Sequence, residues 1–205
     1  MSETKYQLYD WIDREVKQLL KGRCFVIRWA DDFIIGFEFE TDAEMVMKVI
    51  PKRFNRYELE LHPDKTSLIK FGKPVNKSKD SEKNGTFDFL GFTFYWDKGR
   101  KGIWVIKKKT ARKRLNRFMK MTWNWCKENR HDPLQDQHMT LCSKLRGFYQ
   151  YFGVRCNYKA LESAFENAER SWRFWLSRRS HKGKVLFDEL RTALPLPKPR
   201  IIHNI

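Results

Sequence analysis

Two apolar runs separated by a pair of adjacent carboxylates constrain the fold of this 205-residue chain more than any other feature. The runs are residues 24–29 and 33–37, and Asp31 and Asp32 fall in the polar break between them. Short apolar runs rich in β-branched and aromatic residues that flank such a break predict a buried β-hairpin with the carboxylates at its turn.

The adjacent carboxylates point to a cation site. Like charges repel and are costly to desolvate, so a fold that brings two of them together usually supplies a cation. Hard oxygen ligands suit Mg²⁺, and carboxylates that hold two Mg²⁺ ions roughly 4 Å apart are the polymerase and nuclease arrangement for phosphoryl transfer. An ordinary surface turn is the alternative, because Asp is common in turns.

The sequence Trp29-Ala30-Asp31-Asp32 resembles the Tyr-x-Asp-Asp box of reverse transcriptases. The wider run over residues 19–37 resembles bacterial group II intron reverse transcriptase/maturases in particular. Trp29 replaces the usual Tyr, which keeps the bulk and the apolar face but loses the hydroxyl. The resemblance implies that Asp31 and Asp32 are catalytic ligands of Mg²⁺ in a two-metal site.

Lys65 and Thr66 resemble the next motif of the family, a strand that ends in Lys-Thr. In the family this Lys lies near the incoming triphosphate, so the resemblance implies a catalytic role for Lys65. A compact ammonium suits phosphate neutralisation or proton donation to pyrophosphate. Apart from the resemblance, Lys65 is an ordinary surface charge.

Phe89, Leu90, Gly91 and Phe92 resemble the primer-grip box of the family, within a strand predicted over residues 87–94. A Gly in a strand permits close backbone approach, and the resemblance implies that a DNA primer makes this approach. The alternative is a bulge in a packed hairpin.

The remaining elements of the first half follow from periodicity and turn residues. A helix is predicted over residues 5–20, with Leu8, Ile12, Val16 and Leu19 on its buried face. Residues 41–44 form a capping-box pattern that starts a second helix, which Pro51 should kink or divide. The buried positions expected in this second helix are Val46, Met47, Val49, Ile50 and Phe54. Strands are predicted over 66–71 and 103–106, with a polar loop over 72–86 and a turn over 97–102.

Positive charge is concentrated in the second half of the chain. Residues 1–100 hold 18 Lys and Arg against 17 Asp and Glu, whereas residues 101–205 hold 24 against 8. This asymmetry predicts a polyanionic partner for the second half. Five of the eight Trp also lie there, and their spacing favours packing in the core for most of them.

Three amphipathic helices are predicted in this basic half, over residues 110–129, 134–152 and 158–179, with a shorter one over 182–194. Residues 142–153 resemble the maturase-specific segment of group II intron proteins. The candidate nucleic-acid-binding residues are Lys107, Lys108, Lys109, Arg112, Arg114, Arg117, Lys120, Lys144, Arg146, Arg173, Arg178 and Arg179.

The rest of the composition predicts a cytoplasmic protein with no membrane contact. No apolar run approaches the roughly 20 residues of a membrane span, and no signal peptide is visible at the N-terminus. Cys24, Cys126, Cys142 and Cys156 are scattered, as expected of reduced thiols. His138 and Cys142 share a helix face, but two ligands do not make a zinc site.

The predicted fold is α+β, a partial polymerase palm over residues 1–106, followed by a helical thumb/maturase-like RNA-binding domain over 107–194 and an extended tail over 195–205. The partners implied by the resemblance are a group II intron transcript, an RNA template and a DNA primer. Only about thirty residues precede Asp31, which leaves no room for the upstream metal-binding Asp and the fingers of the family. We therefore expect an incomplete metal site and a C-terminal fragment that is inactive alone, or one half of a split enzyme.

Two other functions fit part of the pattern. A non-catalytic RNA-binding module would need only the basic half. An unrelated Mg²⁺ nuclease with a basic helical domain would account for the carboxylate pair and the charge, but for neither Lys65-Thr66 nor residues 89–92.

Overall fold

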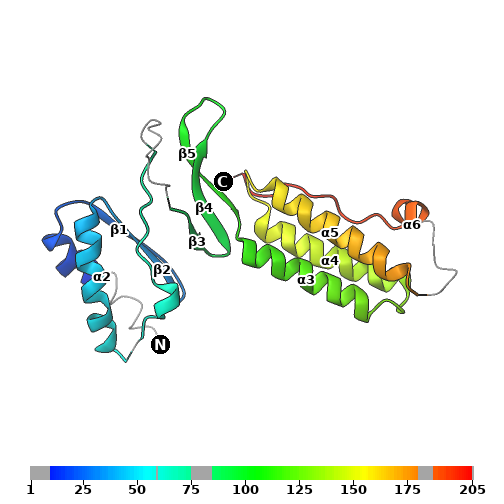
Figure 1. Ribbon diagram of the computed structural model, residues 1–205, viewed down its shortest axis with the longest axis horizontal. Coiled ribbons are helices and arrows are strands. Elements are labelled where there is room, and N and C mark those ends of the chain that lie inside the picture. The colour runs from blue at the N-terminus through cyan, green and yellow to red at the C-terminus, as the bar shows by residue number, and fades with distance from the viewer. Residues whose placement is uncertain (1–9, 59, 75–84, 180–186, 205) are drawn as a thin grey trace. The chain divides into compact units, whose positions relative to one another are not determined.

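The computed structural model describes residues 10–58, 60–74, 85–179 and 187–204 (Figure 1). The chain forms two compact units, residues 1–85 and 86–205. Antiparallel sheets with helices make up the N-terminal half, and a helical region follows, so the predicted α+β class is confirmed. None of the described helices is long and apolar enough to cross a membrane.

A two-stranded antiparallel hairpin is the centre of the first unit. Strands β1 (Cys24–Trp29) and β2 (Asp32–Phe37) pair along their whole length, as the apolar runs predict. The expectation that the hairpin is buried is wrong for one of its faces, because Phe25, Ile27 and Trp29 are 57%, 49% and 67% exposed. Side chains alternate across a strand, and the helices of this unit cover only the opposite face.

The covered face packs on a small apolar core. It contains the buried residues Trp11, Ile12, Val16, Val46 and Ile50. The first of these lie in a helical stretch that is π-helical over η1 (Ile12–Val16) and 3₁₀-helical over η2 (Lys17–Leu19). This change of helical type disrupts the regular spacing, and Leu19, expected on the buried face, is 72% exposed. Leu8 lies outside the described residues.

Helix α2 (Glu40–Asn55) departs from its predicted capping and its predicted break. It begins at Glu40, so Thr41 lies inside the helix, and the N-cap residue Phe39 makes no side-chain cap. Pro51 does not divide the helix, which continues to Asn55. Val49, expected to be buried, is exposed.

The segment after α2 contains a single short helical turn, η3 (Pro63–Lys65). The strand predicted over residues 66–71 is absent from the described structure. Its one backbone bond to another segment, from Gly85 N–H to the carbonyl of Lys70 at 2.9 Å, is not enough to form a ladder. Ten residues of the predicted polar loop, 75–84, lie outside the described residues.

The second unit starts with a three-stranded antiparallel sheet of β3 (Phe87–Phe89), β4 (Phe92–Lys98) and β5 (Trp104–Thr110). The single strand predicted over 87–94 is wrong, because the chain turns between Phe89 and Phe92, which pair across the hairpin. Strand β5 extends beyond the predicted residue 106, since residues 107–110 continue to pair with β4.

Helices α3 (Arg112–Glu128), α4 (Leu134–Phe152) and α5 (Tyr158–Leu176) follow and pack side by side, close to their predicted ranges (Figure 1). Their shared core includes Leu141, Leu145, Leu161, Ala168 and Trp172. Indole Nε1 of Trp172 donates to Oε1 of Gln137 at 2.9 Å, so the buried polar groups satisfy each other. The short helix α6 (Phe187–Ala193) completes the helical region.

The C-terminal segment, residues 195–204, is extended and lies along α4. Leu196 is buried in the core of the helices. Gly153 O accepts the backbone N–H groups of Ile202 at 2.7 Å and His203 at 2.9 Å. Nε2 of His138 lies 3.0 Å from Pro195 O and 3.2 Å from Sγ of Cys142, so this His–Cys pair contacts the C-terminal segment.

Candidate active site and nucleic-acid interface

Asp31 and Asp32 lie at the tip of the β1–β2 hairpin with both side chains exposed. Ala30 and Asp31 connect the strands, and Asp32 begins β2 opposite Trp29. Ala30 has a φ of 52°, in the left-handed region that favours Gly, and its carbonyl accepts a hydrogen bond from Nε of Arg28 at 2.9 Å. The turn is tight, and it presents both carboxylates to solvent.

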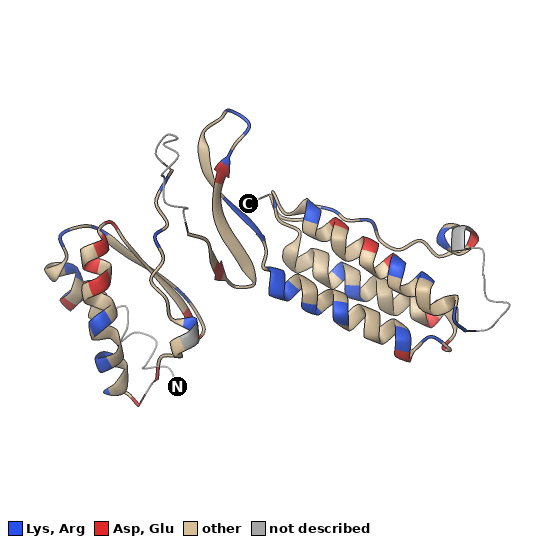
Figure 2. Cartoon of the chain, in the orientation of Figure 1, with Lys and Arg blue, Asp and Glu red and all other residues tan. Residues whose placement is uncertain are grey.

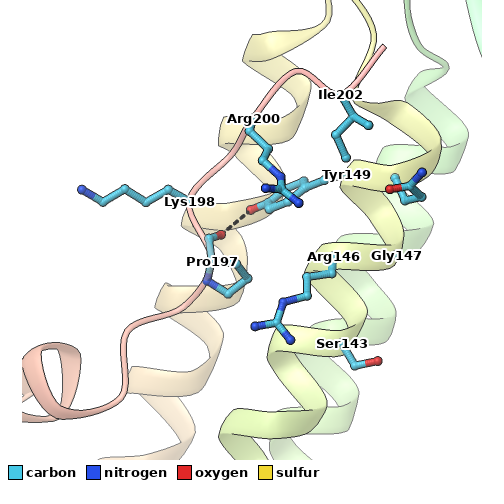
Figure 3. Close-up of a pocket in the computed structure, with 9 residues that line it drawn as sticks. Ser143, Arg146, Gly147, Tyr149, Pro197, Lys198, Arg200 and Ile202 are labelled. Atoms are coloured by element: carbon cyan, nitrogen blue, oxygen red, sulfur yellow. Dashed lines mark hydrogen bonds between the residues drawn. The ribbon is translucent and has the colours of Figure 1, made fainter.

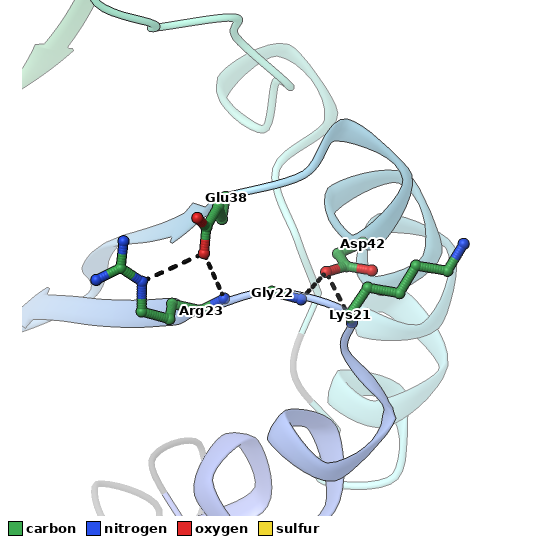
Figure 4. Close-up of polar contacts among 5 residues, drawn as sticks. All are labelled: Lys21, Gly22, Arg23, Glu38 and Asp42. Carbon is green, nitrogen blue, oxygen red and sulfur yellow. Dashed lines mark hydrogen bonds and ion pairs between the residues drawn. The ribbon is translucent and has the colours of Figure 1, made fainter.

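The base of this hairpin is tied to helix α2 by Asp42, which is only 4% exposed. Oδ2 of Asp42 accepts the backbone N–H groups of Lys21 at 3.1 Å and Gly22 at 3.0 Å, just before β1 begins (Figure 4). Glu38, at the end of β2, accepts the backbone N–H and Nε of Arg23, and these hydrogen bonds lower the pKa of the Glu38 carboxyl. The Asp42 hydrogen bonds therefore tie the base of the hairpin to helix α2, and the Glu38–Arg23 hydrogen bonds join its two strands at that base.

The described residues do not complete a metal site around the carboxylate pair. Asp31 and Asp32 are the hard oxygen ligands that Mg²⁺ prefers. No group of three or more His, Cys, Asp or Glu side chains that could hold a metal ion occurs within the described parts of the chain. At least one further ligand would therefore have to come from elsewhere.

Lys65 ends the η3 turn and is exposed. Its backbone N–H and that of Thr66 both bond to His62 O at 3.1 Å, and Oγ1 of Thr66 donates to the same carbonyl at 3.0 Å. Within the described residues, no ion pair joins Lys65 to either carboxylate. Lys65 is therefore placed by a compact turn and not by a strand end.

The motif over residues 89–92 is a two-residue hairpin turn. Leu90 and Gly91 both have positive φ, 50° and 77°, the geometry of the tight turns that match strand twist. The carbonyl of Leu90 accepts from the hydroxyl of Tyr151 at 2.9 Å, and the carbonyl of Gly91 accepts from Ala111 N–H at 2.9 Å. Both turn carbonyls are thus held by the helical region of the same unit.

Three successive lysines of the candidate interface lie on strand β5 and not at the start of a helix. Nζ of Lys107 pairs with Asp97 on β4 at 2.8 Å, which lowers the pKa of the Asp97 carboxyl and raises that of Lys107. Lys108 lies over the ring of Phe92 at 5.9 Å, and Lys109 over the ring of Tyr95 at 4.9 Å. Alternation places Lys108 on one face of the sheet and the other two on the opposite face.

Helix α3 carries the densest row of exposed cations (Figure 2). Arg112, Arg114, Arg117 and Lys120 are all exposed, and no carboxylate of the described chain forms an ion pair with any of them. Guanidinium and ammonium groups that are not ion-paired are available to phosphates, whose contacts dominate nucleic-acid affinity.

The other candidate cations are spread over α4, α5 and the end of α5. Lys144 lies over the Trp125 ring at 5.5 Å, and Arg178 over the Phe174 ring at 4.3 Å. Arg179 donates to the carbonyls of His131 at 3.0 Å and Asp132 at 3.2 Å. Arg173 is exposed on α5, and Arg146 lines a pocket beside the C-terminal segment. Arg179 is therefore hydrogen-bonded to backbone carbonyls, whereas the side chain of Arg146 is exposed at the pocket.

Sequence reasoning missed the side chains that position these groups. Asp42 anchors the carboxylate hairpin, Tyr151 holds the turn at Leu90, and Asn157 joins the sheet to the helices. The only available signal was local, since Asp42 sits in a capping-box pattern and Asn157 precedes a helix. Neither pattern identifies a partner that is 20 to 47 residues away along the chain.

Residues 6–94 match the family model of reverse transcriptase (RNA-dependent DNA polymerase), and the match spans the hairpin with Asp31 and Asp32, Lys65 and residues 89–92. A search of curated proteins finds no match to the chain. The family binds nucleic acid and generally uses Mg²⁺. Residues 6–94 of the chain are therefore similar to reverse transcriptase (RNA-dependent DNA polymerase) domains.

Proposed function

We propose that this chain is the C-terminal part of a bacterial group II intron reverse transcriptase/maturase. In this proposal, residues 1–106 are a partial palm, 107–194 a thumb/maturase-like RNA-binding domain and 195–205 a tail. The observation that carries the proposal is that Asp31 and Asp32 occupy a hairpin tip inside the segment that matches the reverse transcriptase family. Asp31 and Asp32 act as ligands of Mg²⁺ and Lys65 acts on the triphosphate.

The polymerase activity is proposed to require a further polypeptide segment, on a separate chain or elsewhere in the same protein. Two features of the hairpin support this requirement. Its described strands have no neighbours on their outer edges, and the face that carries Phe25, Ile27 and Trp29 is open. The carboxylate pair also lacks a third ligand within the described residues. Loss of one preorganised charge-stabilising group commonly lowers the rate by about 10²–10³.

The nucleic-acid partners follow from the second unit. The turn at Leu90 and Gly91 takes the role of the primer grip, because its backbone is rigidly held by Tyr151 and Ala111. The exposed cations of α3 and the lysines of β5 bind an RNA template and the folded intron transcript. Their sequence-independent contacts are expected to be strongly dependent on salt.

Template–primer extension on the purified chain with Mg²⁺ tests the catalytic part of this proposal. The expected result is no extension by the chain alone. Processive synthesis that disappears in Asp31→Asn would show that the chain is a complete polymerase and would refute the need for a further segment.

A non-catalytic RNA-binding module is the second candidate, favoured by the position of most of the net positive charge after residue 100. RNA binding that depends on salt and is unchanged by Asp31→Asn is expected of both candidates. If no added reverse transcriptase segment restores DNA synthesis, the result supports the non-catalytic RNA-binding module. If such a segment does restore synthesis, the result supports the polymerase.

A further inference from the structure

An open pocket of about 750 Å³ lies between helix α4 and the C-terminal segment (Figure 3). Its volume falls within the range of small-ligand sites in proteins. Arg146, Gly147 and Tyr149 line it from α4, and Pro197, Lys198 and Arg200 line it from the C-terminal segment.

The two walls of this pocket are fixed to each other. Tyr149 is 2% exposed, and its hydroxyl donates to Pro197 O at 3.1 Å across the pocket. At one end of the C-terminal segment, Gly153 O accepts the N–H of Ile202 at 2.7 Å. At its other end, the side chain of Leu196 is buried in the core of the helices. The pocket is therefore preformed and does not depend on a ligand to assemble it.

The charges on the walls are all of one sign. Arg146, Lys198 and Arg200 line the pocket, whereas no Asp or Glu does. None of the three cations forms an ion pair with another residue that the structure describes. Figure 3 shows Arg146 reaching out from α4 and Arg200 reaching from the C-terminal segment over the ring of Tyr149. Guanidinium groups on two sides suit a phosphate, because each fork can bind two of its oxygens.

Gly147 leaves space beside these cations. It lies in the interior of α4, where Gly lowers helix stability relative to Ala. A Cβ built on Gly147 meets no atom within 4 Å. A larger side chain could therefore grow into the pocket without displacing its walls.

We propose that this pocket binds one nucleotide of single-stranded RNA, with its phosphate between Arg146 and Arg200. The inference rests on the RNA-binding part of the proposed function and gives it a specific site. A duplex keeps its bases stacked inside and cannot enter a pocket of this size, whereas an unpaired nucleotide can. Ser143 and Gln150, which also line the pocket, offer a hydroxyl and an amide to the ribose 2′-OH.

Binding of a fluorescein-labelled U12 oligonucleotide to the full chain, followed by anisotropy, tests this site. Gly147→Leu adds a side chain at the wall of the pocket without changing the net charge, and we expect about tenfold weaker binding or more, because this side chain would obstruct the bound nucleotide. Arg146→Gln/Arg200→Gln should also weaken binding and lower the salt slope by about 1–2. A 12-base-pair RNA duplex should bind Gly147→Leu and the wild-type chain alike.

Two matched controls separate the pocket from general effects. Gly72→Leu adds the same side chain at an exposed Gly with nothing within 4 Å, and Arg170→Gln removes one positive charge, half of what the double Arg variant removes, from an exposed position on α5. Both should change U12 affinity by less than about twofold. Helix content by circular dichroism shows whether the Gly147→Leu chain is folded. If it is unfolded, the Arg146→Gln/Arg200→Gln variant provides the test of the pocket.

The inference is wrong if folded Gly147→Leu binds U12 like the wild-type chain, a result that leaves salt-dependent RNA binding elsewhere intact. It is also wrong if a poly-Glu peptide binds the chain as tightly as U12 does and this binding is lost in Gly147→Leu. That result would indicate an acidic protein partner. Absence of U12 and duplex binding by the wild-type chain would instead refute the RNA-binding part of the proposed function itself.

Discussion

Asn157 and Thr110 form two reciprocal hydrogen bonds that join the end of strand β5 to the start of helix α5. Oδ1 of Asn157 accepts the backbone N–H of Thr110 at 2.8 Å, and Nδ2 donates to Oγ1 of Thr110 at 2.8 Å. Nδ2 also donates to Phe152 O at 2.8 Å, and Asn157 is 1% exposed. This buried amide therefore adds to the Tyr151–Leu90 and Ala111–Gly91 hydrogen bonds that hold the sheet against the helices.

Replacement of this amide should cost much of the stability of the second unit. Asn157→Ala leaves the Thr110 N–H and hydroxyl and the Phe152 carbonyl without their partner, and we expect a loss of about 2–4 kcal/mol in the free energy of unfolding. Urea denaturation followed by circular dichroism measures this loss. Asn116→Ala, at an exposed position on α3, should change stability by less than about 0.5 kcal/mol. An equal effect of the two changes would contradict the anchoring role.

Asp42 should control the stability of the carboxylate hairpin. In Asp42→Ala, the N–H groups of Lys21 and Gly22 lose their acceptor, and each lost bond is worth about 0.5–1.5 kcal/mol. Hydrogen exchange of the β1 and β2 amides should accelerate at least about tenfold, because the hairpin opens more often. Glu44→Ala, exposed on the same helix, is the control, and unchanged exchange in Asp42→Ala would disprove the role.

Replacement of Ala30 by Gly should stabilise the folded protein. Its φ of 52° lies in the region that costs a non-Gly residue about 1–2 kcal/mol. Ala30→Gly removes this cost but adds freedom to the unfolded chain, so a net gain of up to about 1 kcal/mol is expected in thermal unfolding. The same replacement at Ala43, within helix α2, should destabilise the chain by about 1 kcal/mol. A loss of stability in Ala30→Gly would argue against the strained turn.

The Asp97–Lys107 ion pair should make the stability of the folded chain depend on pH in the acidic range. The pKa of the Asp97 carboxyl lies below its ordinary value of 3.8 because Lys107 Nζ and the Lys98 N–H donate to it. A carboxyl with a lower pKa in the folded state stabilises that state above its unfolded pKa, and the contribution disappears as pH falls through the folded pKa. Lys107→Met should raise the pKa of Asp97 toward 3.8 in an NMR titration, whereas Lys113→Met should leave it unchanged.

Local sequence patterns predicted the elements whose burial follows from their own periodicity. The apolar runs around Asp31 and Asp32 predicted the β1–β2 hairpin, and the amphipathic pattern over residues 134–152 predicted α4 with its observed bounds. These signals work because one face of each element packs on a nearby core.

The features that sequence patterns missed depend on partners far along the chain. Lys107 lies in a strand because β4 pairs with it, although the polar run itself favours no strand. Asp42 bonds to Lys21 and Gly22 and does not cap its own helix. The left-handed conformation of Leu90 has no signal in Leu itself, and only the following Gly91 indicates the turn.

Complementation of primer extension is the most direct test of the central claim, that the hairpin with Asp31 and Asp32 works only with a further reverse transcriptase segment. The chain is mixed with a polypeptide that carries the fingers and the upstream Asp of a group II intron reverse transcriptase, a template–primer and Mg²⁺. We expect extension in the mixture, none with either polypeptide alone, and none when the chain carries Asp31→Asn. Extension that is unaffected by Asp31→Asn would show that this hairpin does not work as the polymerase site.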